Sequence, residues 1–191
     1  KDSEQSWSQH LFASISFLKH YNLHDDTHIL DLGTGGGLPG IPLAIMKTKI
    51  NFLLVDSIQK KIAAVQDILL SLGLPNVSAI CSRAEDLSKR KDYSQSFDYI
   101  VTRAVAPIKD LVNWGKPFLV TQSNRNAIDS SIQHDYIEAG SIVMLKGGDI
   151  SKEVEEAKIK TPFKNIIIKS IVADGLEQDV LVDKKIVILK P

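Results

Sequence analysis

A glycine-rich turn after an acidic residue is the first place in this sequence where residue type and spacing indicate chemistry. Residues 28–45 read HILDLGTGGGLPGIPLAI, so a short apolar run containing Asp31 leads directly into Gly33, Gly35 and Gly37. Because glycine has no side chain, a turn of this kind lets backbone N–H groups approach a nucleotide-like ligand. The turn therefore predicts a ligand site at the end of a strand.

Two kinds of ligand fit this turn. Gly35, Gly37 and Gly40 satisfy G-x-G-x-x-G, which is typical of dinucleotide sites where a pyrophosphate binds a helix N-terminus. Residues 31–37 also match the acidic-x-G-x-G-x-G signature of class I methyltransferases. S-adenosylmethionine has no phosphate but carries an α-ammonium and a sulfonium, and the carboxylate of Asp31 suits a cation, directly or through water. The sequence therefore favours S-adenosylmethionine.

The next two predicted strands also end in polar residues. Asp56 ends the apolar run FLLVD, 56 − 31 = 25 residues after Asp31. An acid here can accept hydrogen bonds from both ribose hydroxyls, which fits either cofactor, and we expect Ser57 to lie beside it. Ala84 and Glu85 follow the third strand, where methyltransferases contact adenine. Glu85 fits the acidic first turn of a helix equally well.

The elements that must position these residues alternate along the chain. Strands are predicted at 28–33, 52–57, 77–81, 97–104, 140–148, 165–173 and 184–190, and helices at 6–20, 40–48, 57–73, 107–119 and 151–158. Alternation of strand and helix predicts a mostly parallel sheet with helices on both faces. We therefore expect a seven-stranded, Rossmann-like class I methyltransferase fold with a short N-terminal helix. The last two strands are expected to be antiparallel neighbours.

The 191 residues are enough for one α/β domain, and we predict a single methyltransferase domain over 1–191. Residues 1–24 are expected to form an N-terminal helical segment, and because the chain starts at Lys1 rather than Met we expect residues before it to be missing. Residues 121–139 are polar and rich in turn-forming residues. We interpret them as an insertion that runs over the surface.

Charge and cysteine content limit the possible partners and location of the protein. The 23 Lys and Arg residues balance the 23 Asp and Glu residues, which counts against nucleic-acid binding but does not exclude a local basic patch. The single cysteine, Cys81, permits no internal disulfide and fits a cytoplasmic location. No apolar run approaches the roughly 20 residues that cross a bilayer. We expect no metal, no membrane association and a monomer.

Missing motifs narrow the methyl acceptor. Enzymes that methylate exocyclic amines place N-P-P-[YF] after the fourth strand, where this chain has TRAVAP. No Pro-Cys dipeptide is present, so the cysteine-adduct route to C5 of pyrimidines is not indicated. Cys81 itself is interpreted as a small buried apolar residue rather than a nucleophile.

Longer stretches resemble one family, ribosomal RNA small subunit methyltransferase G. The matching stretches are QHLFASI, DLGTGGGLPGIPLAI, LVDSIQKKIAAVQ, SRAEDL, FDYIVTRAVAPIKDLVNW and MLKGG. The resemblance covers nearly the whole chain except 121–139. It implies transfer of a methyl group from S-adenosylmethionine to N7 of one guanosine in 16S ribosomal RNA, with that RNA or the small ribosomal subunit as partner.

The resemblance also implies roles for individual residues. Gly33 and Leu38 would line the cofactor site, Ala84 and Glu85 would hold the adenine end, and Arg103 would face both the cofactor and the incoming base. The sequence departs from the family in two places. Its N-terminal helical segment is shorter than is usual in the family, and its insertion is longer than in the shorter members.

Methyl transfer to guanine N7 requires few catalytic groups from the protein. N7 has an in-plane lone pair and no proton to lose, so no general base is expected and the enzyme must align the reactants and exclude water. Arg103 would position the base by reading O6 or by stacking, or it would form a structural salt bridge to Asp31 or Glu85. Lys146, at the end of the fifth strand, would contact an RNA phosphate or lie solvated.

Two alternatives remain from the residues alone. One is a methyltransferase that acts on a small molecule or a protein, which the neutral net charge supports. The other is a non-catalytic or NAD-binding dinucleotide module. Asp31, two residues before Gly33, counts against that module.

Overall fold

One sheet of seven strands forms the centre of the molecule. The structure is a computed structural model and describes residues 11–103, 105–121, 136–171 and 183–191. The strands are β1 (His28–Leu32), β2 (Asn51–Asp56), β3 (Val77–Cys81), β4 (Tyr99–Arg103), β5 (Ser141–Gly147), β6 (Asn165–Ser170) and β7 (Lys184–Lys190). They lie in the order β3-β2-β1-β4-β5-β7-β6.

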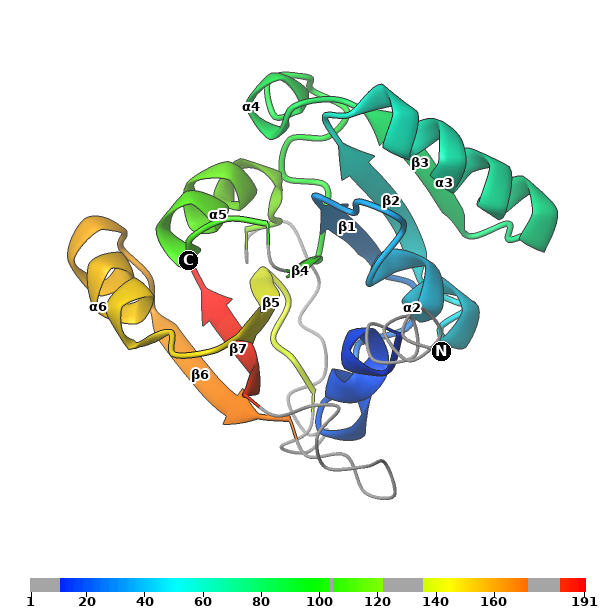
Figure 1. Ribbon diagram of the computed structural model, residues 1–191. Helices are drawn as coiled ribbons and strands as arrows, with labels where there is room; N and C mark the ends of the chain where they lie inside the picture. Colours follow the sequence, from blue (N-terminus) through cyan, green and yellow to red (C-terminus); the bar gives the residue numbers. More distant parts are fainter. Residues whose placement is uncertain (1–10, 104, 122–135, 172–182) are drawn as a thin grey trace.

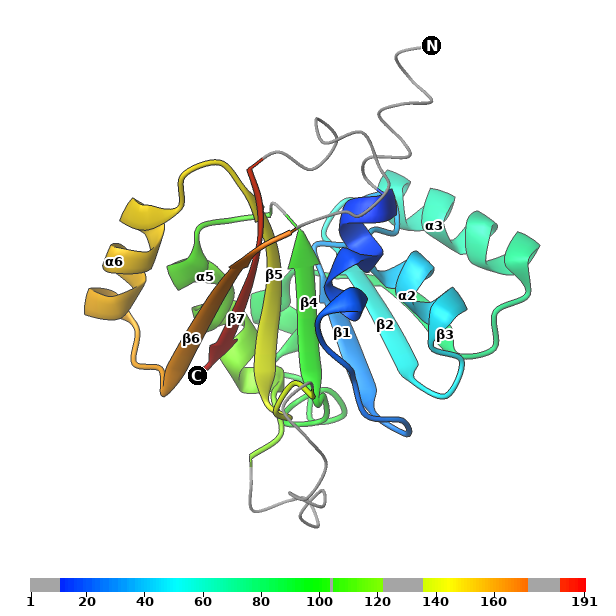
Figure 2. The ribbon, with the colours of Figure 1, turned by 90° about the horizontal axis from the view of Figure 1, so that it is seen from below.

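The direction of the strands confirms the predicted sheet. β3, β2, β1, β4 and β5 are parallel neighbours, and β7 pairs antiparallel with both β5 and β6. Strand order reverses between β1 and β4, because the chain goes from β1 out to β2 and β3 and then returns to the other side of β1. Ligands of open α/β sheets bind at such a switch point, outside the carboxyl ends of the strands. Figure 1 looks onto this carboxyl edge, which is the upper edge of the sheet in Figure 2.

Helices cover both faces of the sheet, as predicted (Figure 2). They are η1 (Ser16–Lys19), α2 (Gly40–Met46), α3 (Gln59–Leu72), α4 (Ala84–Leu87), α5 (Ile108–Gly115), η2 (Lys116–Phe118) and α6 (Ser151–Lys160). One buried apolar cluster joins the sheet to the N-terminal helix, α2 and α3, and a second joins it to α4, α5 and α6. Because both faces are covered, the central strands are apolar on both sides, and β4 is buried along Tyr99–Thr102.

The amphipathic pattern of α3 shows how sequence sets an element. Ile62, Val65 and Leu69 recur at helical spacing and form its buried side. The helix ends at Gly73, whose φ of 59° is the left-handed conformation that favours glycine as a helix C-cap. The helix predicted over 57–73 therefore ends at the expected residue.

Several predicted boundaries were wrong in detail. The helix predicted over 107–119 divides into α5 and the 3-10 helix η2, where Pro117 interrupts the α-helical hydrogen-bond pattern. The strand predicted over 165–173 ends at Ser170. In the N-terminal segment, residues 11–15 are α-helical and continue as η1, while the first ten residues lie outside the described residues.

The predicted surface excursion over 121–139 is wrong at its carboxyl-terminal end. Ile137 is 3% exposed, and its backbone oxygen accepts a hydrogen bond from the buried Tyr99 hydroxyl at 3.0 Å. Tyr136 forms a β-bridge with Asn22 and stacks on His24. This end of the insertion packs against the sheet because it must lead into β5, and residues 122–135 lie outside the described residues.

Candidate functional site

The turn after β1 is held by the carboxylate of Asp31. Asp31 is fully buried, and its Oδ2 accepts hydrogen bonds from the Thr34 hydroxyl at 2.6 Å and from the Gly40 amide at 2.8 Å. Its Oδ1 is also buried and has no hydrogen-bond partner among the described residues. Asp31 therefore connects the strand, the turn and the first residue of α2.

Burial makes Asp31 an unusual acid. Loss of water around the carboxylate raises its pKa from 3.8 to about 7, against the opposing effects of the Thr34 and Gly40 hydrogen bonds and the positive charge of Arg103. A cation that binds close to the turn would stabilise the ionised form of this buried carboxylate. The α-ammonium and sulfonium of S-adenosylmethionine supply such charge, so the residues present fit this ligand.

The glycines of the turn serve different purposes. Gly33, with φ of 75°, lies under Val105, where an added Cβ would come within 2.5 Å of a Val105 methyl carbon. Gly37, with φ of 92°, is buried, and an added Cβ there would come within 2.3 Å of Ile41. Gly35, with φ of 59°, has no heavy atom within 4 Å of that position. Gly35 and its neighbour Gly36 therefore face open space, whereas Gly33 and Gly37 pack against side chains of the protein.

Asp56 connects the turn to the next helix. Its Oδ2 accepts the Gly35 amide at 3.0 Å and lies 3.7 Å from the Lys61 ammonium, and its Oδ1 accepts the Ile58 amide at 2.9 Å. An ionised carboxylate offers about four acceptor positions, so hydroxyl donors can still bind it. Its position at the end of β2, 8% exposed, suits the recognition of ribose hydroxyls.

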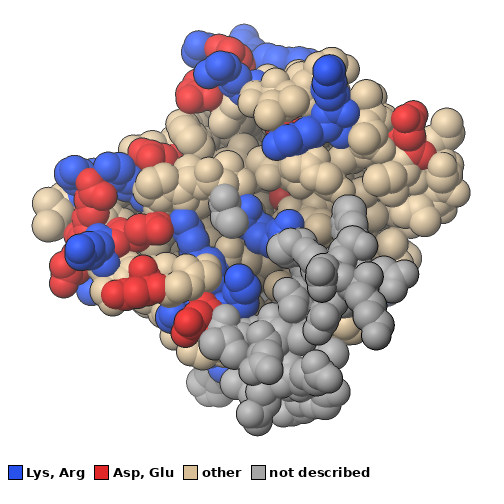
Figure 3. Space-filling model, viewed as in Figure 1, with Lys and Arg blue, Asp and Glu red and all other residues tan. Residues whose placement is uncertain are grey.

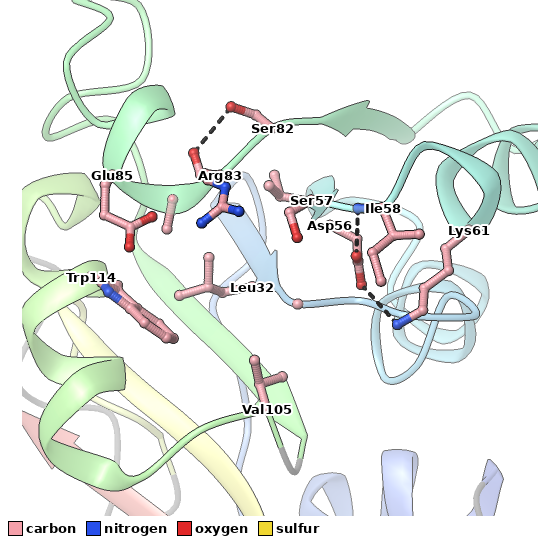
Figure 4. Close-up of a pocket in the computed structure, with 13 residues that line it drawn as sticks. Leu32, Asp56, Ser57, Ile58, Lys61, Ser82, Arg83, Glu85, Val105 and Trp114 are labelled. Atoms are coloured by element: carbon pink, nitrogen blue, oxygen red, sulfur yellow. Dashed lines mark hydrogen bonds and ion pairs between the residues drawn. The ribbon is translucent and has the colours of Figure 1, made fainter.

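A cleft of about 300 Å³ opens at the carboxyl ends of β1, β2 and β3. In Figure 4, Asp56 and Lys61 lie on one side of this cleft, Glu85 and Trp114 on the other, and Leu32 between them. Its lining residues are Leu32, Gly33, Val55, Asp56, Ser57, Ile58, Lys61, Ser82, Arg83, Ala84, Glu85, Val105 and Trp114. The cleft thus has an apolar floor and polar groups at its two ends, as ligand sites commonly do.

The cleft brings together five of the ten predicted cofactor-site residues and leaves the other five outside its lining. Those that line it are Gly33, Asp56, Ser57, Ala84 and Glu85. Those that do not are Asp31, Gly35, Gly37, Leu38 and Arg103. Asp31 and Gly37 are buried behind the turn, while Leu38 is half-buried and donates its amide to the Thr34 oxygen at 3.0 Å.

Sequence reasoning did not single out Trp114, Val105 or Lys61. Trp114 lies on α5, far from the glycine motif in the chain, and its only signal was an apolar position in a predicted helix. Val105 follows β4 and covers Gly33. Lys61 lies in the first turn of α3, and its ammonium pairs with Asp56 at 3.7 Å.

The position of Glu85 is compatible with both of its predicted roles, and the contact with adenine stays a prediction. It is exposed and lies in the acidic first turn of α4, and it also lines the cleft. Ala84 begins α4 and is half-buried at the same end of the cleft. The start of α4 therefore lies at the opposite end of the cleft from Asp56.

Arg103 ends β4 beside the switch point. It is half-buried, burial lowers its pKa, and the charge of Asp31 opposes that shift. Among the described residues no carboxylate lies within ion-pair distance of its guanidinium. The predicted structural salt bridge to Asp31 or Glu85 is therefore absent from this part of the chain, although Arg103 and Asp31 influence each other through their charges.

Lys146 is not the solvated lysine that one reading predicted. Only 8% of its side chain is exposed, and its ammonium pairs with Glu153 at 2.9 Å and donates to the Ala106 backbone oxygen at 2.5 Å. A phosphate contact would have to compete with both partners. The structure therefore gives this lysine a place inside the protein that its position after β5 did not reveal.

The described residues contain no cluster of His, Cys, Asp and Glu that could hold a metal ion. Within the same residues, none of the helices has the length and apolar character needed to cross a membrane.

Solved structures define the class to which this fold belongs. The chain is similar to TrmK of M. capricolum bound to S-adenosyl-homocysteine (TM-score 0.57, 14% identity, 93% of this chain and 66% of that one). It is also similar to M. jannaschii TYW2 in complex with AdoMet (TM-score 0.60, 13% identity, 93% and 74%) and to an rRNA methylase of Streptococcus thermophilus (TM-score 0.57, 13% identity, 94% and 93%). The fold is that of the Rossmann-like class I methyltransferases, as predicted.

The particular family follows from the sequence. The family model described as GidB, rRNA small subunit methyltransferase G, matches residues 1–182, and the chain belongs to this family. It is 35% identical over 189 residues to the ribosomal RNA small subunit methyltransferase G of Christiangramia forsetii, which covers 99% of this chain and 78% of that protein. The corresponding protein of Chlorobium luteolum is 40% identical over 149 residues, covering 78% of this chain and 53% of its own length.

The family match confirms the resemblance drawn from the motifs, and it favours a methyltransferase over a dinucleotide-binding module. By its name the family methylates ribosomal RNA rather than a small molecule or a protein. The chain spans about half the length of some curated relatives and more than three quarters of others.

Proposed function

We propose that this chain transfers the methyl group of S-adenosylmethionine to N7 of a guanosine in 16S ribosomal RNA, acting in the cytoplasm. The observation that carries the proposal is the coincidence of the family match with the cleft at the ends of β1, β2 and β3. Asp56 lies at one end of this cleft and the start of α4 at the other, where we expect the ribose and the adenine respectively. When bound, S-adenosylmethionine supplies an electrophilic methyl group on its sulfonium.

The chain's own residues bind the cofactor, orient the two reactants and shield them from water. Asp56 accepts hydroxyl donors, the start of α4 receives the adenine, and Asp31 favours positive charge beside the turn. Guanine N7 has no proton to lose, so none of these residues needs to act as a base. Arg103, at the end of β4, is then available to orient the incoming guanine through O6 or by stacking on its plane.

The local charge at the carboxyl edge of the sheet suits a polyanionic acceptor, although the net charge of the whole chain is zero. Lys184 and Lys185 begin β7, which runs antiparallel, so they lie at the same edge as the ends of β4 and β5. Figure 3 views this edge and shows Lys and Arg side chains near the middle of the face, with acidic side chains frequent over α6. Local positive charge is what attracts an RNA backbone, whatever the net charge.

The test is transfer of a labelled methyl group. S-adenosylmethionine with a labelled methyl would be incubated with the protein and either naked 16S RNA or small ribosomal subunits, both from cells that lack this methylation. The RNA would then be digested and its nucleosides separated. We expect label in 7-methylguanosine, while label in another nucleoside, or none in RNA, would overturn the proposal.

A matched pair of assays separates the cofactor from the acceptor. Calorimetric titration with S-adenosylhomocysteine is expected to show binding, and titration with NAD is expected to show none. Binding of S-adenosylhomocysteine without RNA labelling would keep the cofactor assignment and contradict only the acceptor.

A further inference from the structure

A largely buried ion pair lies beside the acceptor side of the site and is not explained by cofactor binding. It joins Lys146, the sixth residue of β5, to Glu153 in the first turn of α6, with 2.9 Å between ammonium and carboxylate. The exposed fractions of the two side chains are 8% and 35%. Burying an ammonium is costly unless it is paired and hydrogen-bonded, so this pair marks a place with a specific structural demand.

Both members of the pair also bind the backbone that follows β4. The Lys146 ammonium donates to the Ala106 oxygen at 2.5 Å, and the same Glu153 oxygen that pairs with Lys146 accepts the Ile108 amide at 3.2 Å. We call residues 105–108 the post-β4 segment. Its path is thus fixed at one carbonyl and one amide, two residues apart, by a single pair of opposite charges.

The post-β4 segment is where the cofactor side and the acceptor side of the site meet. Val105 lines the cleft and rests on Gly33, the first glycine of the turn. Arg103, just before the segment, is the residue expected to orient the incoming base. A shift of this segment would therefore disturb the alignment of both reactants, and misplacement by about 1 Å can cost about a hundredfold in rate.

The pair acts at long range in the chain. Lys146 and Ala106 are 40 residues apart, and Glu153 and Ile108 are 45 residues apart. Glu153 of α6 therefore fixes the first residue of α5, although the two residues lie far apart in the chain. No motif of neighbouring residues predicts this contact.

We propose that Glu153, acting through Lys146 and the Ile108 amide, is a positioning residue that sets the post-β4 segment for methyl transfer. We call the Lys146–Glu153 pair, with its contacts to the Ala106 oxygen and the Ile108 amide, the brace. Lys146 then has a structural role and is not an RNA-phosphate ligand. The inference rests on the proposed function, because it is methyl transfer to RNA that the brace is expected to serve.

The experiment compares Glu153→Gln with Glu155→Gln. Glu155 is exposed on the same helix, so both variants lose one negative charge from α6 and only one loses the brace. Each variant, with Lys146→Met and the double variant, would be assayed for transfer to small subunits at several salt concentrations. Hydrogen exchange of peptides spanning 103–113 and thermal melting would accompany the assays.

For a brace, we expect Glu153→Gln and Lys146→Met to lower kcat by about tenfold to a hundredfold. KM for the subunits and its salt dependence should stay close to those of the unaltered protein. The double variant should be little worse than the poorer single variant, because both changes remove one unit. Glu155→Gln should behave like the unaltered protein.

A phosphate ligand gives the opposite pattern. Lys146→Met would then raise KM for the subunits and reduce the slope of log affinity against log salt by about one, while Glu153→Gln would leave kcat unchanged. That result would overturn the proposal.

Hydrogen exchange separates failure of the brace from failure of the proposed function. We expect faster exchange at the Ile108 amide in Glu153→Gln than in Glu155→Gln, whatever the methyl acceptor. Equal exchange in the two variants would overturn the brace. Faster exchange in a protein that does not label RNA would contradict the proposed function alone.

Discussion

The cofactor side and the acceptor side of the site are held by different kinds of contact. On the cofactor side, Asp31 and Asp56 accept backbone amides from Gly40, Gly35 and Ile58, with chain separations of 9, 21 and 2 residues. On the acceptor side, the Lys146–Glu153 pair spans only 7 residues, but its contacts with the Ala106 oxygen and the Ile108 amide span 40 and 45 residues. The Lys109–Glu156 pair joins α5 to α6 across 47 residues. The contacts on the cofactor side fix one turn, whereas those on the acceptor side fix the packing of whole elements.

This difference explains what could be predicted from the sequence. The turn, Asp31 and Asp56 form a local pattern, because the residues that bind each other lie close in the chain or at the ends of adjacent parallel strands. The strand alternation also predicted the sheet and its antiparallel last pair. The motif did not distinguish the glycines that pack inside the protein, such as Gly37, from Gly35, which faces open space.

The acceptor side could not be predicted in the same way. Lys146 stood alone after a strand, so its type and position allowed either a phosphate contact or a solvated side chain. Its partner Glu153 lies in a helix that reads simply as charged, and nothing in the spacing joins the two. Trp114 was hidden for the same reason, because a half-buried aromatic in a helix is usually core rather than the wall of a ligand site.

The largest expected effect comes from Gly35→Val. An added side chain here meets no protein atom at its Cβ, and we expect it to block the approach of the cofactor to the turn, so that S-adenosylhomocysteine affinity falls below detection by calorimetry. The positive φ costs about 1–2 kcal/mol of folding free energy for an L-residue. Full-strength binding by a folded Gly35→Val variant would show that the turn does not contact the cofactor.

Arg103→Ala should come next. Because no carboxylate among the described residues pairs with this guanidinium, unfolding free energy should change little. Methyl transfer should fall by about a hundredfold if Arg103 orients the base. Parallel measurements of methyl transfer, S-adenosylhomocysteine affinity and thermal melting would distinguish a role in orienting the base from a structural role. Losses of stability and activity in step would point instead to a structural role.

Asp31→Asn tests the buried charge on the cofactor side. Because the pKa of Asp31 is raised from 3.8 to about 7 by folding, the native state binds more protons than the unfolded state between these values. This group's contribution to unfolding free energy therefore falls as the pH rises from about 4 to about 7.

Denaturant unfolding of the ligand-free protein at several pH values would measure this contribution. The difference between the unaltered protein and Asp31→Asn should change in favour of the variant as the pH rises. A difference that is constant over this range would mean that Asp31 titrates in the folded protein as it does in the unfolded chain.

The smallest effect is expected from Glu156→Gln on the acceptor side. Hydrogen bonds from Lys109 and Lys160 lower the pKa of Glu156 to about 2, but these side chains are partly exposed and screened by water. The melting temperature should fall by about 2 °C at low salt, and the difference should disappear in 1 M salt. An effect on methyl transfer as large as that of Glu153→Gln would mean that the acceptor side depends on general α5–α6 packing.

A crystal structure of the protein with S-adenosylhomocysteine would test the cofactor site most directly. We expect the ribose at Asp56, the adenine at Ala84 and Glu85 with Trp114 as a wall, and the amino-acid end beside Gly33 and Gly35. We also expect Lys146 and Glu153 to remain paired. Adenine outside this cleft, or a ribose that does not touch Asp56, would contradict the central claim.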